Sequence, residues 1–152
     1  MACYQLERTQ ELALPKTRVF AFFAEPTNLQ ALAPAFLHFR FLTPLPIPMA
    51  AGTLIDYEIR LFGIPMRWRT LIESYEPETA FVDVQVAGPY RSWRHRHEFI
   101  ATPAGTMVRD VVEYELPFGP LGALAHALFV RRTLEQIFDY RRTRVSELLS
   151  RA

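Results

Sequence analysis

The sequence predicts an α+β fold in which a seven-stranded, curved antiparallel sheet packs around one long C-terminal helix. Three observations lead to this prediction. Residues 53–116 hold five segments rich in β-branched and aromatic residues, separated by short turns. Residues 121–149 carry apolar residues mostly three or four positions apart, which is the spacing of a helix with one buried face. Most glycines and prolines fall between these segments, where turns need the backbone angles they provide.

The N-terminal third of the chain is predicted to add two strands and two short helices. Its apolar residues alternate loosely at first, and Pro15 is favourable at the start of the first helix. Pro34 ends the second helix, and a proline-rich stretch follows the short second strand. The expected elements are a strand over 3–14, helices over 16–24 and 26–32, and a strand over 38–42.

The remaining strands are expected over 53–61, 66–75, 80–87, 92–102 and 106–116. A sheet of this size has one face to bury, and the terminal helix is the only large element left to cover it. On the outer side of that helix we expect the pairs Arg131–Glu135 and Glu147–Arg151. We interpret the arginine pairs at 131–132 and 141–142 as solvated, although one guanidinium could turn inward toward an anionic ligand. A curved sheet that grips a long helix leaves space between the two. We therefore expect a single domain over residues 1–152, with a cavity beneath the helix.

The composition narrows the classes of function. The formal net charge is +1, from 17 basic and 16 acidic residues, so we expect no nucleic-acid partner. Cys3 is the only cysteine, which excludes an intrachain disulfide and a cysteine-rich metal site. Residues 1–10 lack the apolar core of a signal peptide, and the longest apolar stretch, 117–130, is shorter than the ~20 residues of a membrane span. We expect a cytoplasmic protein without an integral membrane segment.

Four phrases of the sequence resemble a bacterial branch of a known superfamily. They are GTLIDY (52–57), GIPMRWRT (63–70), GPYRSWRH (88–95) and DVVEYELP (110–117). With the order of elements, they resemble the START-like, or SRPBCC, superfamily of helix-grip proteins, which includes polyketide cyclases, plant allergen-type lipid carriers and coenzyme Q-binding proteins. The resemblance spans essentially the whole chain and implies a pocket for a small apolar or aromatic molecule. Because members range from carriers to cyclases, it does not fix an activity.

Alternation along each strand separates the residues that face the helix from those that face solvent. The strand over 80–87 is ambiguous, because its valines compete with Phe81, Asp83 and Gln85, and we place the latter three inward. The other inward residues are Ile55, Tyr57, Ile59, Leu61, Trp68, Thr70, Ile72, Trp93, His95, His97, Phe99, Val108, Asp110, Val112, Tyr114 and Leu116.

Two histidines and two aspartates are thereby predicted to meet on the inner face. A turn over residues 102–105 places His97 opposite Asp110 and Trp93 opposite Tyr114. Directly opposed side chains lie roughly 4.5–5.5 Å apart at Cβ, close enough for an imidazole–carboxylate hydrogen bond. Asp83 can reach either histidine from the neighbouring strand. A nearby acid raises the pKa of a histidine whereas burial lowers it, so the direction of the pKa shift of His95 and His97 stays open.

This polar cluster has three interpretations. It could satisfy buried polar groups and fix the strand register, or it could bind the polar end of a ligand. It could also transfer protons, and the candidate catalytic residues are then His95, His97, Asp110 and Tyr114. We expect no metal, because a third strong ligand is not assured and the spacing of His95 and His97 on a strand should hold the imidazoles apart. No cofactor motif is present.

The leading hypothesis is a protein that binds a small hydrophobic or aromatic molecule (lipid, isoprenoid, quinone or polyketide-like) between the sheet and the C-terminal helix. The alternatives are an enzyme of the aromatase, cyclase or dehydratase type, and a protein-interaction or regulatory module whose docking stripe is Arg67, Arg69, Arg94 and Arg96. A homodimer is left open. The candidate ligand-binding residues are Tyr57, Ile59, Trp68, Thr70, Asp83, Gln85, Trp93, His95, His97, Asp110, Tyr114, Phe129 and Phe138.

The start of the long helix is predicted to cover the mouth of the cavity. Residues 121–129 are apolar on nearly every side, which favours a cover over a face exposed to water. We expect a ligand to pass between this segment and residues 36–48, with His126 and Phe129 near the opening.

Overall fold

The computed structural model describes residues 2–150, whose seven strands form one antiparallel sheet in the order β1-β7-β6-β5-β4-β3-β2. The strands are β1 (Tyr4–Leu12), β2 (Arg40–Phe41), β3 (Leu54–Leu61), β4 (Ile64–Glu76), β5 (Ala80–Ala87), β6 (Ser92–Thr102) and β7 (Gly105–Glu115). The helices are α1 (Lys16–Phe23), α2 (Thr27–Leu32), the 3-10 turn η1 (Ala35–Leu37), α3 (Gly119–Ala125), the π-helical η2 (His126–Val130) and α4 (Arg131–Ser150).

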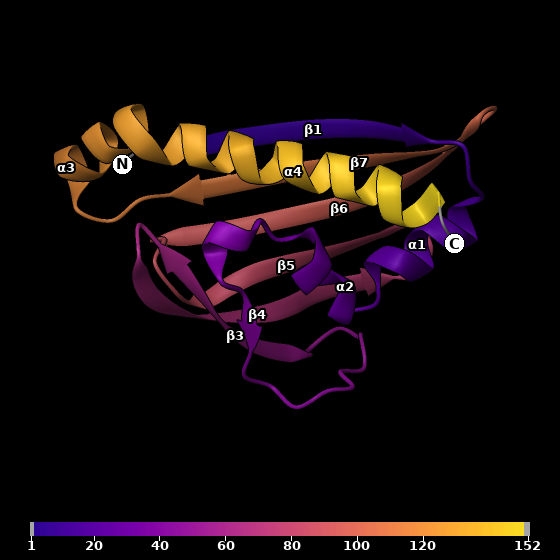
Figure 1. Ribbon diagram of the computed structural model, residues 1–152, viewed down its shortest axis with the longest axis horizontal. Helices are drawn as coiled ribbons and strands as arrows, with labels where there is room; N and C mark the ends of the chain where they lie inside the picture. The colour runs from indigo at the N-terminus through magenta and orange to yellow at the C-terminus, as the bar shows by residue number, and fades with distance from the viewer. Residues whose placement is uncertain (1, 151–152) are drawn as a thin grey trace.

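The last three helical elements are continuous and run along the sheet, while α1 and α2 lie near the C-terminal end of α4 (Figure 1). The predicted fold class and order of elements are confirmed. Two details differ. The long helix contains the π-helical turn η2 where an uninterrupted α-helix was expected. Strand β2 has only two residues, since the 3-10 turn η1 precedes it and is followed by His38 with a φ of +47°. None of the helices within residues 2–150 is long and apolar enough to cross a membrane.

The β6–β7 hairpin has the predicted register. His97 is paired with Asp110 and Trp93 with Tyr114. The chain turns at Gly105, whose φ of +153° is one that side-chain-bearing residues rarely adopt. A Cβ there would collide with the carbonyl oxygen of Leu12. The turn is therefore restricted to glycine, and this glycine allows β7 to approach the end of β1 closely.

Two apolar clusters hold the helices against the sheet. One joins α1 and the C-terminal half of α4 to the sheet, and its buried members include Val19, Phe20, Phe99 and Val145. The other joins the first half of α4 to the far end of β7. Each large apolar side chain that is fully buried contributes about 1.5–3 kcal/mol. The polar side chains of β5, β6 and β7 lie between these clusters.

The outer face of the sheet carries ion pairs, as the alternation predicts. Three of the four arginines of the hypothetical docking stripe have acidic partners: Arg69 contacts Asp56, Arg94 contacts Glu73, and Arg96 contacts Glu98. This pairing leaves little free charge for a partner protein. On α4 the Arg131–Glu135 pair forms at 3.4 Å. Glu147 pairs with Arg144, and its predicted partner Arg151 lies outside the described residues.

Candidate functional site

A pocket of about 200 Å³ lies between the inner face of the sheet and the helices. Strands β3 to β6 form one wall, and α1, α2, η1 and α4 contribute to the other. Most lining side chains are apolar or aromatic, as is usual for sites that bind small molecules. The volume is below the ~300 Å³ at the lower end of ordinary ligand pockets, so the space suits a small molecule.

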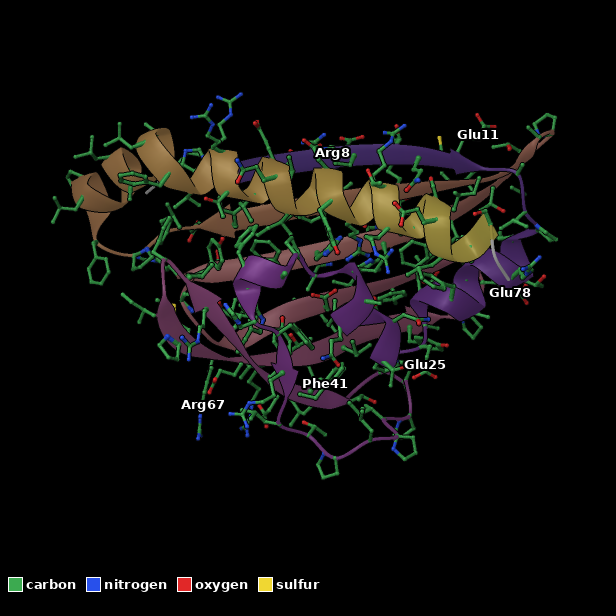
Figure 2. The ribbon with its side chains drawn as sticks, in the orientation of Figure 1. Arg8, Glu11, Glu25, Phe41, Arg67 and Glu78 are labelled. Carbon is green, nitrogen blue, oxygen red and sulfur yellow. The ribbon has the colours of Figure 1, made fainter. Side chains whose placement is uncertain are left out.

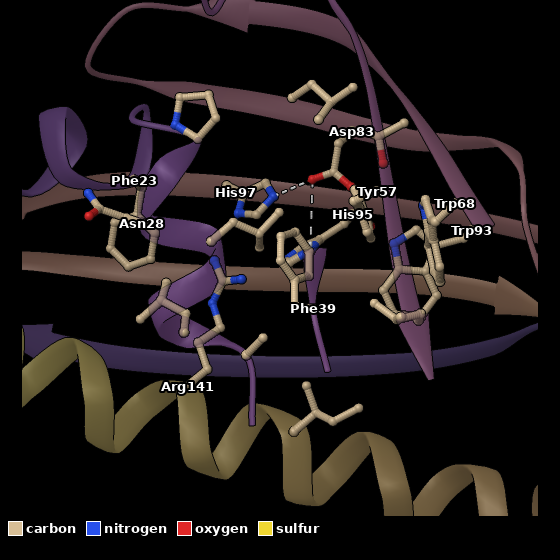
Figure 3. A pocket seen from close by; sticks show the side chains of 18 of the residues that line it. Phe23, Asn28, Phe39, Tyr57, Trp68, Asp83, Trp93, His95, His97 and Arg141 are labelled. Atoms are coloured by element: carbon tan, nitrogen blue, oxygen red, sulfur yellow. Dashed lines mark hydrogen bonds and ion pairs between the residues drawn. The ribbon is translucent and has the colours of Figure 1, made fainter. Parts of the chain in front are cut away.

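Aromatic side chains form one end of the pocket. The indole of Trp68 lies parallel to the ring of Tyr57 at 5.9 Å and perpendicular to that of Trp93 at 5.3 Å. Figure 3 shows the two tryptophans together at this end, with Phe23 and Asn28 at the other. The indole N–H of Trp68 is buried and has no hydrogen-bond partner among the described residues. Such a donor usually finds a partner when it is buried, so this unpaired group requires an explanation.

Two histidines and two aspartates form a polar cluster beside the aromatic end. The imidazoles of His95 and His97 stack with centroids 3.7 Å apart. Nε2 of His97 is 2.6 Å from Oδ2 of Asp83, and Nε2 of His95 is 2.8 Å from Oδ1 of Asp110. In Figure 3 the carboxylate of Asp83 points toward both rings. We call these four residues, together with Arg141, the polar cluster.

The hydrogen bonds differ from the expected pairing of His97 with Asp110. Although these residues are opposite each other in the register, the carboxylate of Asp110 bonds to His95, and Nδ1 of His97 lies 3.4 Å from the same oxygen. Residues two positions apart on a strand share a face, and here their rings stack, so one carboxylate can approach both. The polar cluster is therefore more compact than strand pairing alone predicts.

Arg141 enters the polar cluster from α4. Its guanidinium is 3.9 Å from Oδ1 of Asp110, lies over the ring of Phe23, and has a side chain only 13% exposed. The interpretation of this arginine as solvated is therefore wrong. A signal was present, because position 141 continues the buried series formed by Leu134, Phe138 and Val145 at helical spacing.

The histidine pKa values are displaced in opposite directions. Burial opposes the charge on His97, but the carboxylates of Asp110 and Asp83 outweigh it and raise the pKa above its usual value. Burial and the neighbouring His97 lower the pKa of His95, although Asp110 opposes this. Burial also opposes the charges on the two carboxyls, yet His97 and Arg141 together with the other cluster members hold both pKa values below their usual range. These directions favour two charged carboxylates beside Arg141, and of the two histidines His97 is the one that holds a proton more readily.

Nine of the thirteen residues proposed from the sequence for ligand binding line the pocket. These nine are Tyr57, Ile59, Trp68, Thr70, Asp83, Trp93, His95, His97 and Phe138. Sequence reasoning missed several other lining residues, among them Tyr90, Asn28 and Leu37, because they lie in turns and short helices without a strand alternation to orient them.

Four proposed residues do not line the pocket. The amide of Gln85 bonds the backbone of Tyr90, and Asp110 lies behind the two histidines. The phenol of Tyr114 lies 2.8 Å from Nε2 of His126, outside the pocket, and burial raises its pKa to about 12. Phe129 is 54% exposed and does not cover the cavity.

Asp83, His95 and His97 form a group that could hold a metal ion, since one ligand atom from each lies within 4.8 Å of the others. Two imidazoles and one carboxylate suit zinc or ferrous iron. The imidazoles are not held apart as we expected, and a third ligand is present. In the described structure Nε2 of His97 bonds to Asp83 instead, and Nε2 of His95 bonds to Asp110.

No protein-family model and no curated protein matches the chain. Solved structures do match over nearly its full length. The Zhui aromatase/cyclase from Streptomyces sp. R1128 has a TM-score of 0.78 at 12% identity, covering 99% of this chain and 95% of that one. A protein of Thermus thermophilus has a TM-score of 0.74 at 17% identity, covering 97% of each chain. Ara h 8.0201 has a TM-score of 0.69 at 11% identity, covering 99% of this chain and 100% of that one.

These likenesses concern the backbone, and they agree with the observed arrangement of seven antiparallel strands, two short helices and a long terminal helix. The chain therefore has a helix-grip fold, as its order of elements predicted.

Proposed function

We propose that the protein binds a small, largely apolar molecule that carries at least one carbonyl or hydroxyl oxygen, in the pocket between the sheet and α4. The observation that carries this proposal is the unpartnered indole N–H of Trp68 among the aromatic side chains that line one end of the cavity. A buried donor left without a partner costs about 1–3 kcal/mol. A ligand oxygen that accepts this hydrogen bond would recover that free energy.

The aromatic end and the cavity volume support a compact ligand. Rings of Tyr57, Trp68 and Trp93 offer flat and edge-on contacts to an aromatic or alicyclic molecule. The cavity volume of about 200 Å³ favours one or two fused rings over a long acyl chain. Among the classes considered from the sequence, quinone- or polyketide-like molecules fit this description better than lipids with long chains.

Tryptophan fluorescence tests the proposal directly, because the chain has two tryptophans and both line the pocket. We expect naphthol to quench this fluorescence in a saturable manner. The substitution Ala33→Phe places a ring in the pocket lining and should abolish the saturable response. Ala21→Phe, at an exposed position of α1 outside the lining, is the matched control and should retain it. Equal quenching in all three proteins, or none in the wild type, would contradict the proposal.

A second candidate function is catalysis by proton transfer, favoured by the hydrogen bond between Asp83 and His97 beside the pocket. A histidine paired with a carboxylate is a common general acid or base. The likeness to an aromatase/cyclase agrees with this function but shows the fold alone. Tyr114 is no longer a candidate proton donor, because its phenol lies outside the pocket beside His126.

Proton abstraction can be tested without a known substrate. Tetralone, a bicyclic ketone, exchanges the hydrogens beside its carbonyl for deuterium when a base removes them. We expect the wild type to accelerate this exchange in deuterated water, and His97→Gln to remove the acceleration while naphthol binding persists. Exchange at the same rate in both proteins would eliminate the catalytic function and leave the binding function intact.

A further inference from the structure

Large apolar side chains are exposed together at one end of the molecule. They are Phe62 in the β3–β4 turn and, from the β7–α3 turn to η2, Phe118, Leu121, Leu124, Leu128 and Phe129, which are between 54% and 79% exposed. The rings of Phe62 and Phe129 are 5.9 Å apart, so the two segments meet. Figure 1 shows α3 extending past the end of the sheet at this side. We call these six residues the apolar tip. Exposed apolar surface gathered in this way usually marks an interaction site.

The backbone holds two phenylalanine rings of the tip outward. Phe62 and Phe118 have φ values of +53° and +71°, in the left-handed region that bulky residues rarely occupy. Both stand at the apex of tight turns and are followed by glycines with positive φ. Strained positions of this kind persist where the surrounding structure maintains them and often occur at functional sites.

The sequence around the tip is basic. Residues 59–72 and 116–134, which contain the tip, hold five arginines and no acidic residue. Arg60, Arg67 and Arg132 are exposed and form no ion pair with any residue in 2–150. Figure 2 shows the side chain of Arg67 extending outward from the molecule. These three arginines give the surface around the apolar tip positive charge that no acidic residue in 2–150 pairs with.

We propose that the apolar tip docks on the surface of an anionic lipid bilayer. Leucine and phenylalanine side chains would enter the boundary between headgroups and acyl chains, while Arg60, Arg67 and Arg132 contact the negative headgroups. A second copy of the chain fits this surface less well, because a symmetric dimer would place the same arginines against each other.

The tip is adjacent to the pocket, which connects this proposal to the proposed function on which it rests. Leu61 lines the pocket and directly precedes Phe62. Leu134 lines it as well, little more than one helical turn beyond Phe129. Docking would thus bring one end of the pocket close to the layer in which apolar molecules dissolve.

Vesicle sedimentation tests the docking. We expect the wild type to bind vesicles of phosphatidylcholine and phosphatidylglycerol in equal amounts at least ten-fold more tightly than vesicles of phosphatidylcholine alone. The double substitution Leu121→Ser with Leu124→Ser should weaken binding by ten-fold or more. Its control is Ile100→Ser, a partly exposed apolar position near the β6–β7 turn. Arg132→Glu should weaken binding by about five-fold or more, whereas Arg18→Glu, on exposed α1 surface, should change little.

Three results would overturn the proposal: equal binding to neutral and anionic vesicles, leucine substitutions without effect, and a lipid-independent dimer that the leucine substitutions dissociate. The naphthol titration keeps this test separate from the binding function. If the leucine variant loses vesicle binding but retains saturable quenching, docking and ligand binding are independent properties of one protein. If the wild type binds vesicles but not naphthol, the proposed function fails and the docking surface stands.

Discussion

Replacing Asp110 with asparagine tests whether the negative charge of this residue stabilises the polar cluster. The substitution keeps the size of the side chain and removes its negative charge. Oδ1 of Asp110 lies 2.8 Å from His95, 3.4 Å from His97 and 3.9 Å from Arg141. After the substitution, the largely buried guanidinium of Arg141 has no carboxylate within 4 Å among residues 2–150.

The expected loss of stability follows from that geometry. Removing one partner of a buried ion pair costs about 3–5 kcal/mol, because the other charge stays buried and uncompensated. The amide oxygen of asparagine can still accept a hydrogen bond from His95, so we expect the lower end, about 3 kcal/mol. The pKa of Asp110 is held well below its ordinary value, so its contribution is present at neutral pH. As the pH falls below about 4 and through the lowered pKa, Asp110 takes up a proton and its contribution to stability is lost. The difference in the free energy of unfolding between the wild type and Asp110→Asn therefore becomes smaller at acidic pH.

Urea denaturation at neutral and acidic pH measures both quantities. The control is Glu7→Gln, which removes an exposed carboxylate paired with Arg109 and should change stability little. If Asp110→Asn lowers the free energy of unfolding by less than about 1 kcal/mol at neutral pH, then Arg141 and the histidines do not depend on this carboxylate, and the assignment of charges is wrong.

Three further predictions concern other parts of the molecule. In a proton NMR titration, the pKa of His97 should lie above the usual 6.5 and that of His95 below it. The stability that His97 contributes should therefore be lost as the pH rises through its raised pKa. Equal pKa values for the two histidines would refute the opposite displacements. Thr106→Val should lower the free energy of unfolding by about 1–3 kcal/mol, measured by urea denaturation, because the buried hydroxyl of Thr106 donates to the carbonyl of Leu14; an unchanged midpoint would contradict this. Gly122→Ala should displace the start of α3, because a Cβ would collide with the carbonyl oxygen of Pro117. The displacement should appear as faster amide hydrogen exchange over residues 119–125, and unchanged exchange would refute the close packing.

The sequence predicted the sheet well because strand alternation is a local property. Facing positions of β6 and β7 alternate strictly, and one short turn fixes their register, so the pairs His97–Asp110 and Trp93–Tyr114 could be derived. Alternation left β5 ambiguous, and the choice to place Asp83 inward agrees with its contacts to both histidines. The long helix was placed over this face because it was the only large element left to cover it.

The details of the site depend on contacts between distant segments, which a strand pattern does not describe. Which histidine bonds Asp110 depends on ring rotation and on the stacking of His95 and His97. The inward turn of Arg141 depends on how α4 rotates over the sheet. Tyr114 does not line the pocket, and its hydroxyl lies beside Nε2 of His126, a contact between β7 and the helical segment after it that strand alternation does not describe. The start of the long helix was expected to cover the mouth of the cavity because its residues are apolar on nearly every side. In the structure this segment is exposed and extends past the end of the sheet.

Native mass spectrometry of the protein purified from its own cells tests the central claim most directly. The account predicts a bound small organic molecule in the wild type, retained by Ala21→Phe and absent from Ala33→Phe, whose added ring lies in the pocket lining. The same adduct in all three proteins would show that the molecule binds outside the pocket, which would contradict the account. A wild-type protein that carries no adduct and shows no saturable naphthol quenching would contradict the account of the pocket as a binding site.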